Sequence, residues 1–563
     1  MSEITAKHIG KVLGQAASLL ELLGENHFSV RSMQSASRHF QRLNVPLEQA
    51  LQEISSGKAR GFGKGLREYV SEVSSTGSLD LIDELQAQLP SDLPDLLQIP
   101  GLGGKKVRTL WKELDITSLD ELEAACQDGR VAELKGFAQK TVENILQGIE
   151  KLRSYSSKLR SDQAAALADE ICAALAAAKC CGKIEVVGEI RRCCEVVSQT
   201  VFLLETHQQD GVISALQKLD SLADVKASGK KSITASYGAH PVILELTTEQ
   251  DWFSELVKQT GSSRHLEMLG NLDKSSKADS EEGIYAALSL AFIPPELREG
   301  QGEIESARQM FKTGDSWNLV EASDLRGIIH AHTTYSDGAH SLREMAEAVR
   351  SAGYQYFAVS DHSQTAAYAG GLSPQQIVQQ QKEIAALNKE FAPFKIFSGI
   401  ESDILEDGSL DYDDKVLESF DFVIASVHSR FGLSEAEMTK RITRAVQNKF
   451  TTILGHPTGR LLLKREAYEV DLKQVIDACA ESGTAIEINA QPKRLDLDWR
   501  LLEYALKQGV RIAVCPDAHS TADIDLVKYG VATARKGGLS KDDVVNCMTL
   551  KNFEGYIQGA KAK

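Results

Sequence analysis

Histidine and carboxylate residues end a series of short apolar segments in the C-terminal part of this 563-residue chain. The residues in these positions are His330, His332, His362, Glu401, His428, His456, Asn489, Asp517 and His519. Imidazole and carboxylate groups are typical ligands of zinc, manganese and iron. A single histidine at the end of a strand is usually structural, but six of the 13 histidines of this chain occupy such positions. The pattern therefore indicates a site for several metal ions.

The apolar segments themselves predict how these side chains come together. Seven of them lie between residues 327 and 519, and amphipathic stretches such as 341–353, 373–391 and 471–483 separate most of them. Continuous apolar strands that alternate with helices form a parallel sheet covered by helices, and seven such units predict a barrel. Since strand ends converge on one mouth of such a barrel, the polar residues share that mouth. Asp337 is predicted to supply an additional oxygen ligand.

Arg494 follows the sixth apolar segment, in the sequence INAQPKRLDL. A guanidinium group at the mouth of the barrel could bind a phosphate oxygen. A solvated arginine on a surface loop is an equally good interpretation. The sequence leaves both roles open for Arg494.

The N-terminal 160 residues are predicted to form short helices joined by glycine-rich turns. The segment LLQIPGLGGKKV at 96–107 has the form of a hairpin between two helices, and weaker copies occur at 58–70 and 134–146. Glycines let the backbone approach a phosphate, and a helix N-terminus attracts anions. The pattern resembles the helix-hairpin-helix motif, which binds the DNA backbone without reading its sequence; an ordinary packing corner is the alternative. The residues predicted to contact DNA are Gly101, Gly103, Lys105 and Lys106.

The middle of the chain predicts an α+β unit. An alanine-rich helical stretch at about 162–179 comes first, and segments rich in β-branched residues follow it. These strand-like segments are 184–188, 200–205, 232–238 and 241–247. Glycines bound several of them, as is typical of strands. A polar stretch at 273–282 is predicted to be a loop.

The composition excludes several classes of protein. An apolar share of 42% and a mean hydropathy of -0.22 exclude wholesale disorder. No stretch is long enough to span a bilayer, and the first residues lack the apolar region of a signal peptide. The nine cysteines show neither a disulfide framework nor a zinc-binding spacing, so we expect reduced thiols in the cytoplasm. A net charge of -16 argues against a surface coated with basic residues, so any contact with DNA must be local.

Six motifs in the C-terminal part resemble those of the polymerase-and-histidinol-phosphatase (PHP) domain in order, spacing and identity. They are HAHTTYSDG, VSDH, GIE, SVH, GHP and PDAH, and the resemblance covers about residues 325–560. It implies a distorted seven-stranded barrel that holds three divalent ions, of manganese, zinc or iron, and hydrolyses phosphoesters. By this resemblance, the first ion is held by His330, His332, Glu401 and Asp517, the second by Glu401, His428 and His456, and the third by Asp337, His362 and His519.

Nearly the whole chain resembles the bacterial family X DNA polymerases, which join helix-hairpin-helix repeats and a polymerase palm to a PHP domain. The segment IPPELREG at 293–300 is very similar to the one that links these two domains in that family. The resemblance implies a Gly-Ser phosphate turn, two arginines and three aspartates that hold two magnesium ions. Here Gly188, Arg191 and Arg192 are retained, but Glu189 replaces the serine.

The aspartates of the palm are absent from the positions that the resemblance assigns to them. Gln199 and Val201 occupy the first two positions, and Val242 or Ile243 occupies the third. Neither an amide nor an aliphatic side chain can replace the carboxylate ligands of magnesium. Glu189 also places negative charge where the incoming phosphate would lie. The sequence therefore predicts a degenerate palm that no longer synthesises DNA.

Together these patterns predict a multidomain protein with α+β and α/β parts. The predicted parts are a helical DNA-binding domain at 1–90, a helix-hairpin-helix segment at 91–160, a degenerate palm- and thumb-like domain at 161–318, and a PHP phosphoesterase domain at 319–563. The first hypothesis for function is a DNA-repair enzyme, a metal-dependent 3′–5′ exonuclease or 3′-end-processing nuclease. The alternatives are an active family X polymerase with a PHP exonuclease, a PHP phosphatase of small phosphomonoesters, and a non-catalytic module that recruits repair partners.

Overall fold

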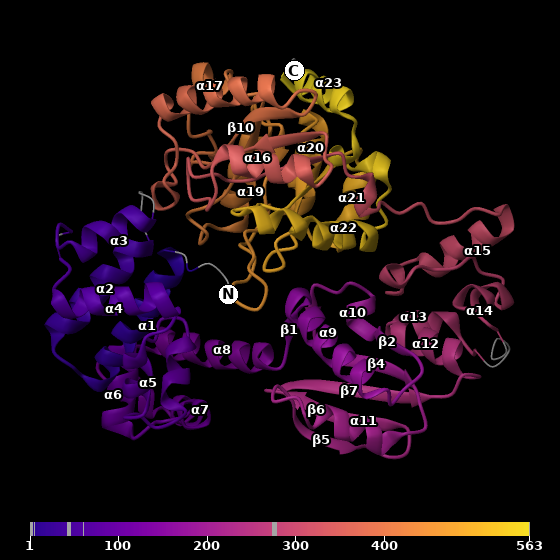
Figure 1. The fold of residues 1–563 in the computed structure, drawn as a ribbon, viewed down its shortest axis with the longest axis horizontal. Helices are drawn as coiled ribbons and strands as arrows, with labels where there is room; N and C mark the ends of the chain where they lie inside the picture. Colours follow the sequence, from indigo (N-terminus) through magenta and orange to yellow (C-terminus); the bar gives the residue numbers. More distant parts are fainter. Residues whose placement is uncertain (1–3, 5, 42–46, 60, 273–277, 562–563) are drawn as a thin grey trace. The chain divides into compact units, whose positions relative to one another are not determined.

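The computed structural model describes residues 4, 6–41, 47–59, 61–272 and 278–561. The chain divides into two compact units, one of residues 1–156 with 367–370 and the other of residues 157–366 with 371–563 (Figure 1). The predicted loop at 273–282 lies partly outside the described residues. The finer division into four domains stays a prediction.

The first unit is a helical block around one apolar core. Its α-helices are α1 (Ala6–Leu23), α2 (His27–Gln41), α3 (Leu47–Ser55), α4 (Lys64–Thr76), α5 (Asp80–Gln86), α6 (Gly104–Leu114), α7 (Leu119–Gln127) and α8 (Gln139–Ser156), and its short 3-10 helices are η1 (Leu93–Gln98) and η2 (Arg130–Glu133). Leu13 of α1, Phe40 of α2 and Leu110 of α6 are all buried in this core. Apolar residues three or four positions apart give each helix one face that packs inward.

Three turns in this unit share one backbone geometry. Each contains a glycine with a positive φ, namely Gly61 (89°), Gly101 (83°) and Gly136 (96°). In each case a helix, α4, α6 or α8, begins three residues after the glycine. Glycine adopts this left-handed conformation at little cost because it has no Cβ. The three predicted hairpins therefore fold alike, although they differ in how closely their sequences match the motif.

The second unit begins with a mixed β-sheet. Its strands are β2 (Ile184–Val187), β4 (Thr200–Glu205), β5 (Ala223–Ala227), β6 (Ser232–Tyr237) and β7 (His240–Thr247), in the spatial order β2-β4-β7-β6-β5, and a separate pair is formed by β1 (Leu159–Arg160) and β3 (Val196–Val197). Helices α9 (Ser161–Ala178) and α11 (Gln209–Leu216) pack on one face of the five-stranded sheet. All four predicted strands are present. The sequence analysis did not predict β5, an edge strand that is largely exposed; its residues, ADVKA, alternate apolar and charged side chains, but Val225 is the one β-branched residue among them.

A buried ion-pair network ties the next helices to the sheet. These helices are α10 (Gly188–Arg191), α12 (Trp252–Thr260), α13 (Ser263–Leu269), α14 (Glu281–Ala287) and α15 (Glu303–Thr313). The fully buried Arg298 places Nη1 2.6 Å from Glu281, which also pairs with Arg191 at 2.6 Å. Burial raises the pKa of the Glu281 carboxyl, but the two arginines outweigh this effect and hold it below its usual value. The carboxylate therefore stays charged between its two partners.

The rest of the second unit is a barrel of parallel strands. The strands are β8 (Gly327–Ile329), β9 (Tyr356–Val359), β10 (Lys395–Asp403), β11 (Phe422–Ser426), β12 (Ile453–Leu454), β13 (Ala485–Asn489) and β14 (Ile512–Cys515). They follow one another in space in the order of the sequence. A parallel bridge between Ala331 and Ala518 joins the segments after β8 and β14, so the barrel is nearly closed. The predicted fold class is confirmed, since each of the seven predicted segments contains one of these strands.

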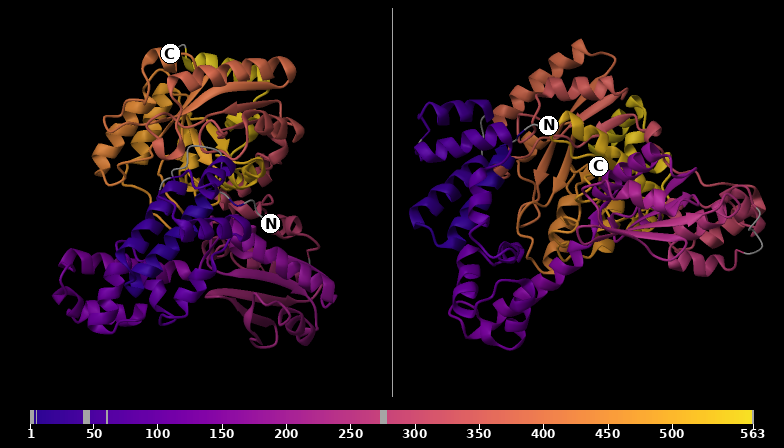
Figure 2. Two further views of the ribbon diagram at one scale, coloured as in Figure 1. Left: turned by 60° about the vertical axis from the view of Figure 1, so that its left-hand side comes forward. Right: turned by 60° about the horizontal axis from the view of Figure 1, so that its bottom comes forward.

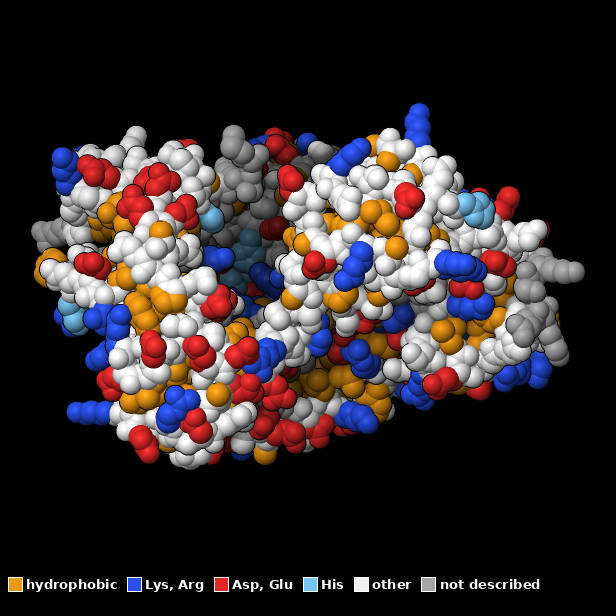
Figure 3. Space-filling view, turned by 90° about the horizontal axis from the view of Figure 1, so that it is seen from below, with side chains coloured by type: hydrophobic (Ala, Val, Ile, Leu, Met, Phe, Trp, Pro, Cys, Tyr) orange, Lys and Arg blue, Asp and Glu red, His pale blue; other side chains and the backbone are white. Residues whose placement is uncertain are grey.

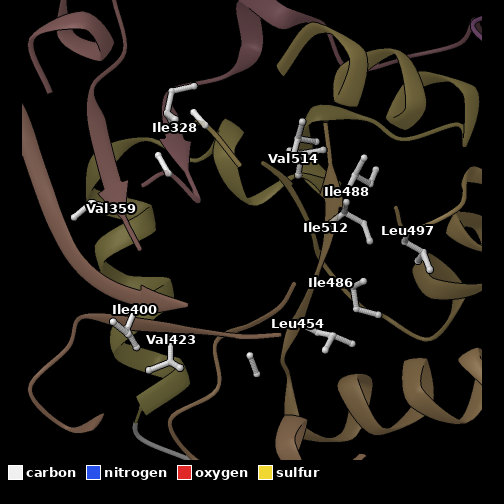
Figure 4. Close-up of a cluster of buried hydrophobic side chains, with 14 of the residues drawn as sticks. Ile328, Val359, Ile400, Val423, Leu454, Ile486, Ile488, Leu497, Ile512 and Val514 are labelled. Atoms are coloured by element: carbon white, nitrogen blue, oxygen red, sulfur yellow. The ribbon is translucent and has the colours of Figure 1, made fainter. Parts of the chain in front are cut away.

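Helices surround the barrel (Figures 1 and 2). Alternate residues of each strand face different layers. The helices are α16 (Leu342–Ser351), α17 (Pro374–Glu390), α18 (Asp414–Leu417), α19 (Glu435–Val446), α20 (Leu472–Ser482), α21 (Leu502–Lys507), α22 (Val527–Lys536) and α23 (Leu550–Lys561). One set of strand residues, including Ile400 and Ile486, packs against these helices, and Figure 4 shows part of it. The other set, including Ala485 and Ala513, packs with Phe553 of α23. Since side chains alternate along a strand, Glu487 and Asn489 share the inner face with Ala485.

Candidate metal centre

Side chains at the C-terminal ends of the barrel strands lie close enough to share metal ions. Three groups of residues offer ligand atoms within 4.8 Å of one another. The groups are His330, His332 and Asp517; His332, Asp337, His362 and His519; and His362, Glu401 and His428. His456 joins them through Glu401, since its Nε2 lies 3.0 Å from Glu401 Oε1. The structure thus brings together all nine residues predicted as ligands, and their assignment to particular ions stays a prediction.

Glu401 lies at the centre of these groups. Its Oε1 is 3.2 Å from His428 Nε2 and 3.4 Å from His330 Nε2, and its Oε2 is 2.8 Å from His362 Nδ1. The side chain is only 1% exposed. Burial raises the pKa of this carboxyl, but the surrounding histidines lower it well below its usual value. One ionised carboxylate that contacts several imidazoles has the geometry that a bridging ligand requires.

His332 connects two of the groups. Its ring stacks on those of His362 and His519, with a centroid distance of 4.3 Å in each case. Burial, followed by the charges of these two histidines, lowers the pKa of His332 to about 3, so its imidazole stays in the neutral form that binds metals. Asp337 Oδ1 lies 3.3 Å from His519 Nε2 and 3.5 Å from His362 Nε2.

Several ring nitrogens of the cluster form no hydrogen bond among the described residues. They include His330 Nε2, His332 Nδ1 and His456 Nδ1, all on buried side chains. A buried polar atom without a partner costs about 1–3 kcal/mol. A metal ion would use the lone pair of such a nitrogen, so the donor set fits divalent cations.

Three residues of the cluster have a strained backbone. His330, His456 and Asp517 have φ values of 67°, 22° and 49°, although none of them is a glycine. Such conformations persist only where the surrounding structure imposes them, and they occur preferentially at functional sites. The residues that impose them here include carboxylates that the sequence analysis did not single out.

Glu487 on β13 links two of the strained histidines. Its Oε1 lies 2.5 Å from His330 Nδ1, and its Oε2 accepts a hydrogen bond of 2.5 Å from the backbone N–H of His456. The side chain is fully buried. A carboxylate that accepts the Nδ1 proton of a histidine leaves Nε2 free for a metal. One feature of the sequence could have pointed to Glu487. It precedes Asn489 by two residues, so both side chains lie on the inner face of the strand.

Asp403 and Asp361 act in a similar way on other parts of the cluster. Asp403 Oδ1 lies 2.5 Å from His428 Nδ1, and Asp403 follows Glu401 by two residues on β10. Asp361 is fully buried and accepts hydrogen bonds from the backbone N–H and the hydroxyl of Thr333, at 2.7 and 2.8 Å. It thereby holds the loop that carries Asp337. Neither residue ends an apolar segment as a histidine does, so the sequence pattern did not reveal them.

Arg494 lies at the edge of the cluster. Its Nε is 4.0 Å from Asp517 Oδ2, and it has no hydrogen-bond partner among the described residues. The side chain is only 15% exposed, so it is not a fully solvated loop residue. In a space-filling view, histidine side chains are visible with lysine or arginine side chains beside them (Figure 3).

The phosphate turn predicted in the palm is engaged in contacts within the protein. Glu189 accepts a hydrogen bond of 2.6 Å from the backbone N–H of Ser198. Arg191 pairs with Glu281, and Arg192 pairs with Glu299 at 2.9 Å. The retained arginines therefore already have carboxylate partners.

The strand that would carry the palm aspartates is apolar. Val201 is buried in a cluster with Trp252 and Leu256 of α12. In the register of β4 and β7, Ile243 lies opposite Val201 and packs against the same cluster. Val242 belongs to the core on the other face of the sheet, so Ile243 is the residue beside the expected aspartate pair.

The hairpin glycines lie at an open surface. A Cβ at Gly101 or Gly103 would meet no atom within 4 Å, whereas one at Gly104 would lie 2.8 Å from the backbone oxygen of Ser18. Lys106 Nζ donates a hydrogen bond of 3.0 Å to the carbonyl oxygen of Gly101, and Lys105 is exposed. The first two glycines therefore leave room for an approaching backbone, and Gly104 packs against α1.

Within the described residues, no helix is long and apolar enough to cross a membrane.

A family model described as "PHP domain" matches residues 329–491, and one described as "SAM-like Helix-hairpin-helix tandem" matches residues 93–151. A probable phosphatase of Thermoanaerobacter sp. (strain X514) is 29% identical over 245 residues, which are 42% of this chain and 95% of the relative. A probable phosphatase of Aliivibrio fischeri (strain MJ11) is 26% identical over 205 residues, and this match covers 35% of this chain and 78% of the relative.

A longer relative matches both units of the chain. The DNA polymerase/3′-5′ exonuclease PolX of Bacillus subtilis (strain 168) is 36% identical over 573 residues, and the match covers 98% of this chain and 99% of the relative. Similarity over essentially the whole length of both proteins includes the hairpins, the mixed sheet and the barrel alike. This protein therefore belongs to the PolX family of bacterial family X DNA polymerases with a C-terminal PHP domain.

Proposed function

We propose that this protein is a metal-dependent DNA phosphoesterase that acts as a 3′–5′ exonuclease or processes 3′ ends in DNA repair. The observation that carries the proposal is the buried cluster around Glu401, in which histidines and carboxylates from separate strands converge. The relative from B. subtilis is named for both a polymerase and a 3′-5′ exonuclease. The apolar surroundings of Val201 favour the second activity for this chain.

The cluster supports a site for three divalent ions of manganese, zinc or iron. In our assignment, the first ion is held by His330, His332, Glu401 and Asp517, the second by Glu401, His428 and His456, and the third by Asp337, His362 and His519. Glu401 would then bridge the first two ions. His330 Nε2 and His332 Nδ1, which form no hydrogen bond within the described residues, support the first site.

The residues of the chain have separate tasks in this proposal. Divalent ions bound by these residues would lower the pKa of a bound water and would neutralise the charge of a phosphate. Arg494 binds a phosphate oxygen and orients the ester, since its buried Nε lies 4.0 Å from Asp517 and forms no hydrogen bond within the described part of the chain. Glu487 and Asp403 hold the imidazoles of His330 and His428 in the tautomer that presents Nε2. No separate protein base is needed.

DNA is the substrate that the first unit supports. Gly101 and Gly103 leave space for a phosphate backbone, and Lys105 and Lys106 add positive charge beside a helix N-terminus. Contacts of this kind carry no sequence specificity. Because the substrate would be DNA and the nine cysteines are all free, we also propose a cytoplasmic location.

A phosphatase of small monoesters is the second candidate function. The match to the Thermoanaerobacter phosphatase covers 42% of this chain and nearly all of that relative, so a barrel of this kind occurs without the N-terminal hairpins. The matching helix-hairpin-helix model at 93–151 favours DNA over a small ester.

Nuclease assays test the main proposal. The chain is incubated with Mn²⁺ and 5′-labelled single-stranded, recessed and 3′-phosphate DNA, with p-nitrophenyl phosphate alongside. We expect shortening from the 3′ end, and a loss of roughly 100-fold or more in Glu401→Ala, because a bridging ligand serves two ions. Glu503→Ala, which alters an exposed glutamate of α21, should retain full activity. Unchanged cleavage in EDTA, or cleavage of p-nitrophenyl phosphate alone, would contradict the proposal.

Metal titrations test the roles of the orienting carboxylates. Both carboxylate oxygens of Glu487 accept hydrogen bonds, whereas a glutamine side chain offers only one acceptor. Glu487→Gln should therefore lower the affinity for two of the metal ions about 10–100-fold. The Asp403 carboxylate contacts the ring of His428. Asp403→Asn should therefore lower the affinity for one metal ion by a similar factor. The measurement is the number of tightly bound Mn²⁺ or Co²⁺ ions in a chelator competition. Wild-type binding in Glu487→Gln would show that this carboxylate is only a packing group.

A hairpin variant tests the proposed DNA contact. Gly103 has an ordinary negative φ and open space around its Cβ position, so Gly103→Val should fold normally while it blocks close approach of a phosphate backbone. We expect DNA affinity, measured by fluorescence anisotropy of the full chain, to fall several-fold and the salt dependence to weaken. Gly555→Val, on α23 with equally open space, is the matched control. Equal affinities for the two variants would make the hairpin a packing corner.

Primer extension tests whether the palm has lost its synthesis activity. We expect no template-dependent elongation with four nucleotides and Mg²⁺ or Mn²⁺, because Gln199, Val201 and Ile243 offer no carboxylate to a metal. Glu401→Ala serves as the background, so that degradation cannot hide synthesis. Gln199→Asp with Val201→Asp should also fail, since the third carboxylate is still missing. Elongation by the Glu401→Ala chain would refute this interpretation of the palm.

A further inference from the structure

Two loops beside the metal centre form a layered stack of planar side chains. Phe431 lies three residues after His428, and Tyr468 closes the loop that begins after His456. The rings of Phe431 and Tyr468 are stacked, with centroids 5.9 Å apart and an interplanar angle of 11°. The guanidinium carbon of Arg465 lies 4.5 Å from the centre of the Phe431 ring. Tyr468 is buried and Arg465 is exposed, so the stack leads from the core to the surface.

Hydrogen bonds hold the stack in place. Arg465 donates from Nε and Nη2 to the carbonyl oxygen of Gly459, at 3.1 and 2.6 Å, and Tyr468 donates its hydroxyl to the carbonyl oxygen of Pro457 at 2.6 Å. Gly459 has a φ of 60°, and a Cβ there would lie 2.7 Å from the Tyr468 ring. Backbone hydrogen bonds in both directions between Leu461 and Arg465 close the loop. The guanidinium plane is therefore fixed before any ligand arrives.

The outer end of the stack carries charge that the described part of the protein does not neutralise. No carboxylate among the described residues forms an ion pair with Arg465. Burial and then the positive charge of Arg494 lower the pKa of Arg465, so the two guanidinium groups act on each other. Arg494 in turn lies 4.0 Å from Asp517 in the metal centre. The loops that carry the two arginines adjoin each other, since the backbone N–H of Leu462 donates a hydrogen bond of 2.7 Å to the carbonyl oxygen of Lys493. Two positive charges at the edge of a phosphoesterase site favour an anionic ligand.

A nucleotide combines the two properties that this surface can recognise. Its phosphate is anionic, and its base presents a flat face that stacks on a guanidinium plane or an aromatic ring. A small phosphomonoester without a base would use only the metal centre and Arg494. We propose that Arg465, supported by Phe431, is the subsite that binds the nucleotide next to the scissile phosphate, its base stacked on the guanidinium plane. This inference rests on the proposed function and names the part of the DNA that the barrel itself recognises.

Variants of Arg465 test the subsite with two substrates. Since stacking of one base contributes about 1–3 kcal/mol, Arg465→Ala should reduce kcat/KM for a single-stranded oligonucleotide by roughly 5–100-fold. Its kcat/KM for p-nitrophenyl phosphate should stay within about twofold, because that ester has no nucleotide base to stack on the guanidinium plane. Arg465→Lys keeps the positive charge but removes the planar guanidinium group. Its kcat/KM for the oligonucleotide should therefore fall nearly as far as that of Arg465→Ala. Arg444→Ala, which alters an exposed arginine of α19 paired with Asp407, should change neither value.

A substrate whose 3′-terminal nucleotide lacks its base separates recognition of the base from a structural role of the loop. The wild-type chain should cleave this substrate more slowly than the intact oligonucleotide, and Arg465→Ala should show no further difference between the two. An equal loss for the oligonucleotide and p-nitrophenyl phosphate, or an unchanged preference for the terminal base in Arg465→Ala, would overturn the proposal. If the wild-type chain cleaves p-nitrophenyl phosphate but no DNA, the proposed function itself fails, and this result is recognisable without any variant.

Discussion

The constraint on which the second unit depends is an ionised carboxylate buried among imidazoles. Removing such a charge from water costs several kcal/mol unless opposite charge or donors surround it. Glu401 is 1% exposed and lies within 3.4 Å of nitrogen atoms from His330, His362, His428 and His456. These residues come from different strands, so only a barrel whose strand ends converge can supply them. The parallel topology is thus a requirement of the site, and a cation is the natural compensation for its charge.

The same constraint explains why the surroundings of the site are rigid. A ligand set that spans several strands is useful only if each ring keeps its tautomer and direction. Glu487 fixes the ring of His330 and the backbone of His456 at once, and both residues have positive φ values. The strain is maintained by a fully buried carboxylate on β13, which pairs with β12 on one side and β14 on the other. Local strain and the order of the metal centre therefore have a common origin.

The sequence predicted much of this arrangement, and its omissions have physical reasons. Residues that end apolar segments, such as His428, stand out because a polar group interrupts a hydrophobic pattern. Glu487 lies within a strand, and its importance comes from contacts with loops 157 and 31 residues away, which no local pattern contains. The sequence left open whether Val242 or Ile243 occupies the third aspartate position, and the register of β4 and β7 was needed to decide between them. The stack of Arg465 on Phe431 joins two loops that are distant in sequence, so it could only be found in space.

The palm has apolar side chains where the resemblance to family X polymerases places carboxylates. Val201 is buried in a cluster with Trp252, so this strand packs as a core strand. The arginines of the turn remain, but Glu281 holds Arg191, and Glu299 binds both Arg192 and Lys536 of α22. Through Glu299, the palm turn is connected to α22 of the barrel, so Arg192 has a structural role that needs no phosphate. Retained residues in a familiar fold therefore do not show that an activity is retained, because the partners of each side chain decide its function.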